Sequence, residues 1–480
     1  MVGSSSLVFG VDLVRLILLD LRHLFRRFAL QKASHPSEWT HTKALAIRSN
    51  SMIPFLSIAL LSLLILSISV GIVLFLLGLS IDALFTAFPL NKALGRMIWS
   101  SSNSATLIAI PFFVLLGEIL VRSGVAARTY EALDRLISWL PGGLVHANIA
   151  TATMFSATSG SSVATAATVS TVAMPQARRL GYDEKLFSGA IAAGGTLGIM
   201  IPPSINLIVY GFLTQSSIPQ LFLAGLIPGL LLALGFILVT ALICTLKPEL
   251  GGPSREFSFR ERVSAIGDLA PIVGLFLMIV GSIYTGFATP TEAAAVGVLG
   301  AVIISALFGS LSIRALHEAM TGTIKITAMI MLIILGASFL NFTLASAGLA
   351  NELDDFLAGL GLGRMELLFV IVLLYIVLGM FIETLSLMVV TIPIIVPIIL
   401  QLDFDVIWFG ILMIVLVEMA LITPPVGLNL YVVQSARDRG TITDVMIGSL
   451  PYVMVMIVML ILLIVFPEIA TWLPNSLESR

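Results

Sequence analysis

The chain has 480 residues, of which 58% are hydrophobic and only 11% charged, and its mean hydropathy is +1.09. Soluble domains carry roughly a quarter charged residues, so this composition excludes an ordinary soluble protein. A net charge of −2 without a basic tract indicates no nucleic-acid partner. Cys244 is the single cysteine, so an internal disulfide is excluded. The sequence lacks a GxxxxGK[ST] loop, which excludes ATP hydrolysis by that route. The sequence shows neither a nucleophile–base pair nor a group of metal ligands, so an enzyme is the weakest interpretation.

Residues 1–50 show no cleavable signal-peptide pattern, because charged residues such as Asp12 and Arg15 interrupt the apolar stretch. Leu13 and Ile17 fall on one face of a helix, which predicts an amphipathic helix at the membrane surface. The alternative is a partly ordered extension.

Beyond residue 50, apolar runs near the roughly 18–20 residues that cross a bilayer recur along the chain. They occupy residues 52–79, 105–121, 221–246, 272–286, 293–308, 324–345, 367–382 and 452–465. The pattern predicts an all-α polytopic membrane protein. The first run fits either one long tilted helix or two short ones.

An internal repeat organises these runs. Pro202-Pro203 recurs as Pro424-Pro425, 222 positions later (424 − 202). Further matches, with one inserted residue after the second proline pair, are Pro175 with Pro397, Asp183 with Asp405, Asn206 with Asn429 and Pro228 with Pro451. A run of matches in register predicts two related halves.

The repeat and the polar, Gly- and Pro-rich segment 247–262 predict the domain organisation. We expect an N-terminal extension (1–50), N-terminal scaffold helices (51–104), a first repeat (105–247), a linker with scaffold helices (248–317), a second repeat (318–473) and a C-terminal tail (474–480). Basic Arg178, Arg179 and Lys185 in the first repeat correspond to an acidic segment with Asp403 and Asp405 in the second. The positive-inside rule therefore predicts repeats of inverted topology.

Small polar clusters interrupt the apolar pattern at residues 156–162 and, at the same offset, at 379–386. An apolar run that turns at small polar residues and then resumes predicts a re-entrant hairpin. Irregular backbone at membrane depth is tolerated only where it is buried in protein or lines a cavity. Close helix packing through small residues is the alternative, but the match between repeats favours two hairpin tips.

The two proline pairs predict broken helices. Two consecutive prolines remove two backbone donors and disfavour helical geometry in the residue before them. Unwinding frees carbonyl groups, which suit Na⁺, and creates a helix N-terminus, which suits a carboxylate. A simple proline kink is the alternative.

Neither hairpin tip nor helix break contains Lys or Arg. An anionic substrate would need helix dipoles, backbone donors and bound cations there, which favours sodium coupling. Glu383 and Glu418 are the acids nearest the breaks, and they would either complement Na⁺ or carry protons. Glu118 and Glu292 flank helix ends and are interpreted as structural.

Several motifs resemble those of one transporter family. They are IPFFVLLGEIL (110–120), SGSSVATAATVS (159–170), GTLGIMIPPSINLIVYG (195–211), LFLAGLIPG (221–229), GFATPTEAAAVG (286–297) and ITPPVGLNLYVVQ (422–434). Together they resemble the large membrane subunit, DctM-like, of tripartite ATP-independent periplasmic (TRAP) transporters. The resemblance runs from about residue 53 to residue 473.

The resemblance implies an elevator: a transport domain of two hairpins and two broken helices that moves against a scaffold in the bacterial inner membrane. It implies a small four-helix membrane subunit and a periplasmic substrate-binding protein as partners, with Na⁺ driving uptake of small carboxylates. Implied sodium ligands are Thr158, Ser159, Gly160 and Gly198 at one site, and Met380, Glu383, Thr384, Thr423 and Gly427 at the other. Implied substrate residues are Ser161, Ser162, Ser204, Asn206 and Asn429.

Thr165 departs from the resemblance, because many relatives carry an acid there. The main alternative function is a stand-alone elevator carrier for di- or tricarboxylates, sodium- or proton-coupled, that needs no binding protein. A channel is a second alternative, but it leaves the matched proline pairs unexplained.

Overall fold

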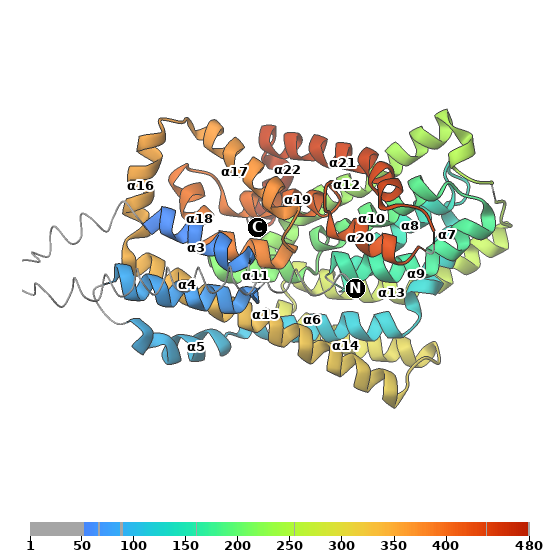
Figure 1. The fold of residues 1–480 in the computed structure, drawn as a ribbon. Helices are drawn as coiled ribbons and strands as arrows, with labels where there is room; N and C mark the ends of the chain where they lie inside the picture. The colour runs from blue at the N-terminus through green and yellow to red at the C-terminus, as the bar shows by residue number, and fades with distance from the viewer. Residues whose placement is uncertain are drawn as a thin grey trace, which may run out of the picture. The chain divides into compact units, whose positions relative to one another are not determined.

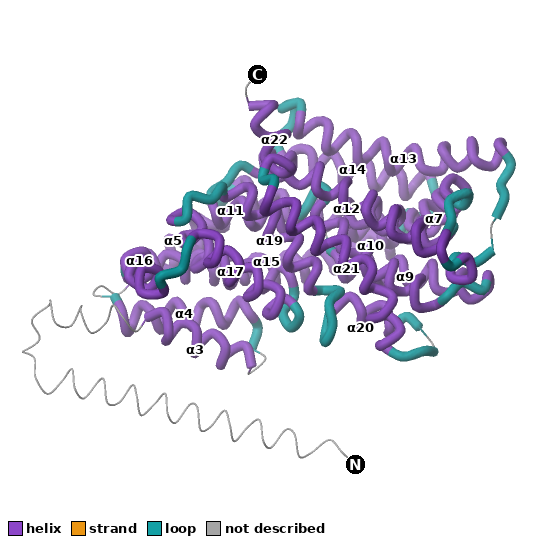
Figure 2. The backbone as a smooth tube through the Cα atoms, turned by 90° about the horizontal axis from the view of Figure 1, so that it is seen from above, coloured by secondary structure: helices purple, strands orange, loops and turns teal. Residues whose placement is uncertain are grey.

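The computed structural model describes residues 52–65, 68–86, 90–159, 161–253, 255–437 and 439–478. Within these residues the chain is helix and loop, without a strand (Figure 1, Figure 2). Seven of the described helices are long and apolar enough to cross a membrane, or eight if one bent pair counts as a span. The prediction of an all-α polytopic membrane protein is confirmed. The amphipathic helix expected in residues 1–50 lies outside the described residues.

The described chain forms two compact units. One unit joins the N-terminal part of the chain, up to Trp99, with Leu335–Leu362. Its elements are α3 (Met52–Ile65), α4 (Val70–Phe85), the 3₁₀ helix η1 (Leu90–Ala93), the start of α5 (Leu94–Ser102), the end of α15 (Ile313–Ala347) and α16 (Leu349–Leu360). The apolar run 52–79 therefore contains two helices, α3 and α4.

Close packing and one buried acid organise this unit. A Cβ atom on Gly336 would come within 2.7 Å of the Gly71 carbonyl oxygen, so α15 and α4 approach through glycine. The carboxylate of Glu352, on α16, accepts a hydrogen bond of 2.9 Å from the backbone N–H of Ile53. This carboxylate caps the N-terminus of α3, where the first N–H groups lack partners in their own helix.

The other unit, Ser100–Ile334 with Gly363–Arg480, contains the elements that the proline pairs mark. The first repeat supplies α6 (Ala105–Arg122), α7 (Val125–Ile137), α8 (Leu144–Ser159), α9 (Ser162–Leu180), α10 (Glu184–Met200), α11 (Ile205–Thr214) and α12 (Ile218–Leu246). The connection contains η2 (Pro248–Leu250), α13 (Phe259–Tyr284) and α14 (Pro290–Leu307). The second repeat continues with α17 (Arg364–Gly379), α18 (Thr384–Gln401), α19 (Val406–Ala420), α20 (Leu428–Ser435) and α21 (Ile442–Val465), followed by α22 (Glu468–Glu478).

The helices of the two repeats match in order and in packing. Helix α9 packs on α20, and the corresponding pair from the opposite repeats, α18 and α11, packs in the same way. Likewise α10 packs on α21, and α19 packs on α12. Local capping also repeats: Asp183 accepts a hydrogen bond from the N–H of Leu186 at 2.9 Å, and Asp405 from the N–H of Trp408 at 2.7 Å. The sequence repeat is therefore a structural repeat.

Helix α10 is the most deeply buried element of the first repeat, with every residue from Leu186 to Met200 buried. It packs against α8 of its own repeat and α21 of the other. A Cβ atom on Gly189 would collide with the backbone of Gly448, and one on Gly448 would collide with the carbonyl of Lys185. Two glycines thus allow the backbones of α10 and α21 to touch, which joins the repeats closely.

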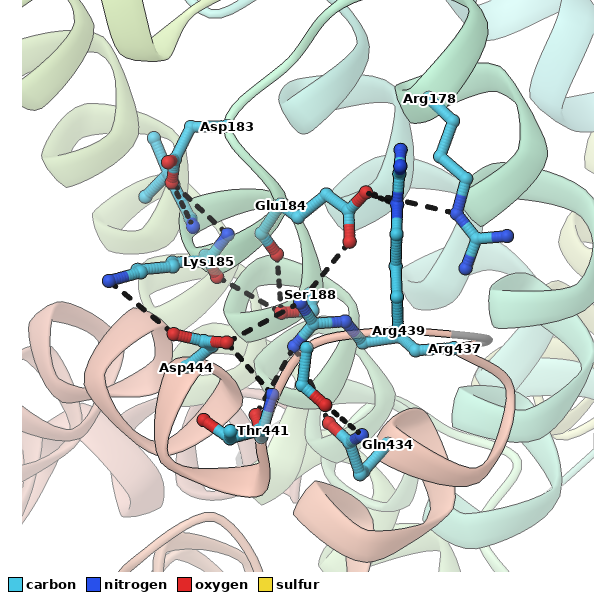
Figure 3. A network of polar contacts seen from close by, with 12 residues as sticks. Arg178, Asp183, Glu184, Lys185, Ser188, Gln434, Arg437, Arg439, Thr441 and Asp444 are labelled. Atoms are coloured by element: carbon cyan, nitrogen blue, oxygen red, sulfur yellow. Dashed lines mark hydrogen bonds and ion pairs between the residues drawn. The ribbon is translucent and has the colours of Figure 1, made fainter.

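A charged network joins the same two helices at their N-terminal ends (Figure 3). The side chain of Arg437 is only 2% exposed, and its guanidinium lies 3.2 Å from the Glu184 carboxylate and 3.8 Å from that of Asp444. Lys185 pairs with Asp444 at 3.4 Å, and Arg439 pairs with Glu184 at 3.2 Å. Because Glu184 begins α10 and the other acid lies in the first turn of α21, the network ties the first repeat to the second.

We expect Gly448→Ala to lower the free energy of unfolding by about 2 kcal/mol or more, because the new methyl meets backbone that cannot rotate away. Gly274→Ala is the matched control: it lies inside α13, with nothing within 4 Å of its Cβ position. Alanine there should be neutral or favourable by up to about 1 kcal/mol. Thermal unfolding of the purified variants measures both, and equal melting temperatures would contradict the close crossing.

Candidate functional site

The first hairpin tip lies between α8 and α9. Ser161 caps α9, its hydroxyl accepting a hydrogen bond of 3.3 Å from the N–H of Ala164. Of the implied sodium ligands, Thr158 and Ser159 lie in the last turn of α8, and Gly160 lies outside the described residues.

The second tip lies between α17 and α18 and repeats this capping arrangement. Glu383 caps α18 by accepting a hydrogen bond of 3.0 Å from the N–H of Ser386. Glu383 and Ser161 thus occupy the same place in their repeats, 222 positions apart (383 − 161). Glu383 is exposed and Met380 is half-buried, so this acid is accessible at the tip.

One carboxylate connects the two tips. The hydroxyl of Ser162, at the first tip, donates a hydrogen bond of 2.6 Å to Oε2 of Glu418. The hydroxyl of Thr384, at the second tip, donates a longer one of 3.5 Å to Oε1. Glu418 is 1% exposed and Ser162 and Thr384 are each 2% exposed, so the junction is buried. No Lys or Arg of the described residues forms an ion pair with Glu418.

The first break separates α10 from α11, and the two helices are bent by 42° at Ile201–Ser204. The prediction that the helix unwinds at Pro202-Pro203 is confirmed. The buried hydroxyl of Ser204 caps α11 by accepting a hydrogen bond of 3.3 Å from the N–H of Leu207. Gly198 is buried in α10, two residues before that helix ends.

The second break separates α19 from α20 around Pro424-Pro425. The peptide bonds of both proline pairs are cis. Gly427 has a φ of +63°, a conformation that favours glycine, and it is the N-cap residue directly before α20. The hydroxyl of Thr423 donates to the carbonyl of Met419 at 2.7 Å, so its oxygen can still act as an acceptor.

The sequence predicts that the break frees carbonyl groups for a cation, but two of the carbonyls here already accept hydrogen bonds. The carbonyl oxygen of Leu421 accepts a hydrogen bond of 3.2 Å from the N–H of Asn429. The carbonyl oxygen of Ile422 accepts one of 3.2 Å from the Ser449 hydroxyl on α21. Tertiary contacts therefore satisfy part of the unwound backbone, as burial in a membrane protein requires.

Two buried asparagines follow the breaks at matching positions. Asn206 is 4% exposed, and its Nδ2 has no hydrogen-bond partner among the described residues. Asn429 is fully buried; its Nδ2 donates to the carbonyl of Ala192 on α10 at 3.3 Å, while its Oδ1 has no described partner. Each break thus presents one unsatisfied amide atom, a donor from the first and an acceptor from the second.

The structure brings together Ser162 and Thr384, from opposite repeats, but through a residue that the predicted site did not include. From the sequence, Glu418 is expected to be an acid near a break that would complement Na⁺ or carry protons, but it is not among the predicted site residues. A usable signal existed, because an acid in an apolar helix is a functional candidate by default. Thr165, the departure from the family pattern, is fully buried in α9. No cluster of three His, Cys, Asp or Glu that could hold a metal ion forms among the described residues.

The model of the family described as "Tripartite ATP-independent periplasmic transporter, DctM component" matches residues 57–469. The C4-dicarboxylate TRAP transporter large permease protein DctM of Pseudomonas aeruginosa is 34% identical over 387 residues, which cover 80% of this chain and 90% of that one. The sialic acid TRAP transporter large permease protein SiaM of Vibrio cholerae is 32% identical over 421 residues, covering 86% and 96%.

The fold is similar to that of the Alcanivorax borkumensis YdaH transporter, with a TM-score of 0.59 over 85% of this chain and 97% of that one. The sequence identity of 14% limits this likeness to the fold. The match to the family covers both hairpins and both breaks. The chain therefore belongs to the DctM component family of tripartite ATP-independent periplasmic transporters, and it is a transport protein and not an enzyme.

Proposed function

We propose that this chain is the large membrane subunit of a sodium-coupled, binding-protein-dependent carrier that takes up small organic acid anions across the bacterial inner membrane. The observation that carries the proposal is the buried polar junction between the two hairpin tips, which contains a carboxylate and no basic side chain. The named substrates of two relatives, C4-dicarboxylates and sialic acid, are both carboxylates.

Charge explains why a carboxylate substrate would travel with Na⁺. Burying an anionic substrate beside the buried side chain of Glu418 is costly without a counter-ion, because the interior stabilises an unpaired charge poorly. The tips and breaks offer no Lys or Arg. Hydroxyl, carbonyl and carboxylate oxygens at Glu383, Thr384 and Thr423 are ligands suited to Na⁺, and bound sodium would neutralise the substrate.

Helix N-termini and amide donors would orient the substrate. The starts of α11 and α20 carry partial positive charge, and both follow the breaks. The Nδ2 group of Asn206, unsatisfied among the described residues, can donate a hydrogen bond to a carboxylate oxygen. We propose that the substrate binds between the tips and these helix starts, near Ser161, Ser162, Ser204, Asn206 and Asn429.

Partners follow from the family. The relatives are named large permease proteins, which supports a complex with a small membrane subunit and a periplasmic binding protein. A stand-alone carrier remains the alternative function, and it predicts uptake by the purified chain without a soluble receptor. Reconstitution with and without these two partners separates the two functions.

We further propose that the two repeats move as one body, as an elevator requires. The backbone contact of α10 with α21 and the charged network around Arg437 support this proposal, because both tie the first repeat to the second. A mechanism in which the repeats part at this end would have to break a buried ion pair, which is costly.

A covalent link at the charged network should therefore leave transport largely intact. We would join Lys185→Cys to Asp444→Cys, whose parent side chains lie 3.4 Å apart, with a short cleavable cross-linker in a Cys244→Ala background. Uptake of radiolabelled succinate by the reconstituted complex should stay within about two-fold of the single-cysteine controls. A large loss that reverses when the linker is cleaved would show that the repeats separate here.

Sodium itself tests the proposed coupling without a known substrate. We expect a saturable rise in melting temperature in NaCl over choline chloride at equal ionic strength, worth about 2.7 kcal/mol at one hundred times Kd for each site. Thr423→Val should weaken the rise. Thr245→Val is its matched control, because that exposed hydroxyl makes the same bond to the carbonyl four residues earlier, at 2.7 Å, on α12.

The same melting temperature in both salts would refute sodium coupling. An equal loss of the sodium effect in both threonine variants would instead refute the second sodium site at Thr423.

A further inference from the structure

We infer that Glu418 is a positioning residue that couples the two halves of the binding site: it holds both hairpin tips, so that sodium binding at one tip changes affinity at the other. The inference rests on the proposed function, and it adds a residue and a physical connection that sodium ligation does not require.

The geometry of the junction carries the inference. Each oxygen of one carboxylate accepts from a different tip, Oε2 from Ser162 at 2.6 Å and Oε1 from Thr384 at 3.5 Å. The first distance is that of a short O–H···O hydrogen bond, and the second is at the limit of hydrogen bonding. Glu418 therefore contacts the first tip more closely than the second.

The junction between the two tips is buried and closely packed. Every residue of α19 from Trp408 to Ala420 is buried, and Glu418 is 1% exposed. An acid in this position costs free energy unless its oxygens are hydrogen-bonded, and the hydroxyls at the two tips supply those bonds. A displacement of either tip would leave a carboxylate oxygen without its donor, so the position of each tip affects the stability of the other.

The connection comes from one repeat only. The position equivalent to Glu418 in the first repeat is Thr196, 222 residues earlier (418 − 196), on α10. Its hydroxyl donates to the carbonyl of Ala193 in its own helix at 2.7 Å. The second repeat therefore supplies the link between the tips, and the first repeat contains no equivalent.

The link also reaches the second break. The backbone carbonyl of Glu418 accepts a hydrogen bond of 3.2 Å from the N–H of Leu421, in the turn that leads to Thr423. Two groups proposed as ligands of one sodium ion, Thr384 and Thr423, are thus both connected to this residue. Since Ser162 belongs to the other tip, a coupling free energy between the two sodium sites has a direct physical route, and such coupling is reciprocal.

The test is a sodium titration of the melting temperature of the purified full-length chain, comparing wild type with Glu418→Gln. Glutamine keeps the size of the side chain but replaces one carboxylate oxygen by an NH₂ donor. One of the two hydroxyls then loses the acceptor to which it donates and can stay in contact only by reversing its role. We expect the sodium concentration at half-saturation to rise about ten-fold, and the steepness of the curve to fall to that of independent sites.

Thr391→Val is the matched control for loss of a buried hydrogen bond. Thr391 lies on α18 of the second hairpin, and its hydroxyl bonds that of Tyr375, on α17 of the same hairpin, at 2.6 Å. This variant should lower the melting temperature in both salts but leave the sodium curve unchanged, because its bond does not connect the two tips.

Ser162→Ala tests the same junction from its donor side, also if Glu418→Gln does not fold. It should reduce the steepness of the sodium curve, because it removes the hydroxyl that ties Glu418 to the first tip. A Glu418→Gln or Ser162→Ala curve that coincides with wild type would overturn the inference and leave the proposed function standing. A wild-type chain without a sodium-specific rise would instead overturn sodium coupling, and the inference with it.

Discussion

Irregular backbone inside an apolar protein must find partners within the protein, and the rest of this structure follows from that constraint. Both broken helices stop at proline pairs, where helical hydrogen bonds end. Groups on neighbouring segments satisfy the freed carbonyls. The backbone N–H of Asn429 donates to the carbonyl of Leu421, and the hydroxyl of Ser449, on α21, donates to the carbonyl of Ile422. The breaks are stable only because neighbouring helices surround them.

The same constraint explains why small residues gather on α10. A helix that lies beside α8 and α21 at once needs room for both neighbours. Gly189 and Gly448 supply it toward α21, and Gly194 supplies it toward α8. The contact also brings the amide of Asn429 to the carbonyl of Ala192, which joins the second break to the first repeat. The close packing of α10 and the hydrogen bond of the buried Asn429 amide therefore depend on each other.

The two repeats share their framework but differ in charge. Hydroxyl groups at Ser161 and Thr196 in the first repeat correspond to the carboxylates Glu383 and Glu418 in the second. The second half of the site is thus the more acidic. The charged network at the start of α10 also lacks a counterpart in the other repeat. Val406 matches Glu184 and Thr214 matches Arg437, and neither of these two residues carries a charge. Matching backbone positions in the two repeats therefore carry side chains of different charge.

Much of the architecture was determined by the sequence alone. Hydropathy predicts the spans, because the bilayer requires apolar length, and proline pairs predict the breaks, because proline cannot donate a backbone hydrogen bond. The repeat offset placed hairpin tips and breaks at matching positions, and the caps at Asp183, Asp405, Ser161 and Glu383 agree with it.

Only the tertiary structure showed that Ser162 and Thr384 meet at Glu418, and that Arg437 bridges two repeats. Ser162 and Glu418 are 256 residues apart in the chain, as are Arg437 and Glu184 at 253. Local pattern describes which groups a segment carries, but not which distant segment it meets. That choice depends on the packing of whole helices. Only a specific arrangement of α9, α18 and α19 places Ser162 and Thr384 beside Glu418, and only the packing of α10 against α21 brings Glu184 to Arg437, in the loop before α21.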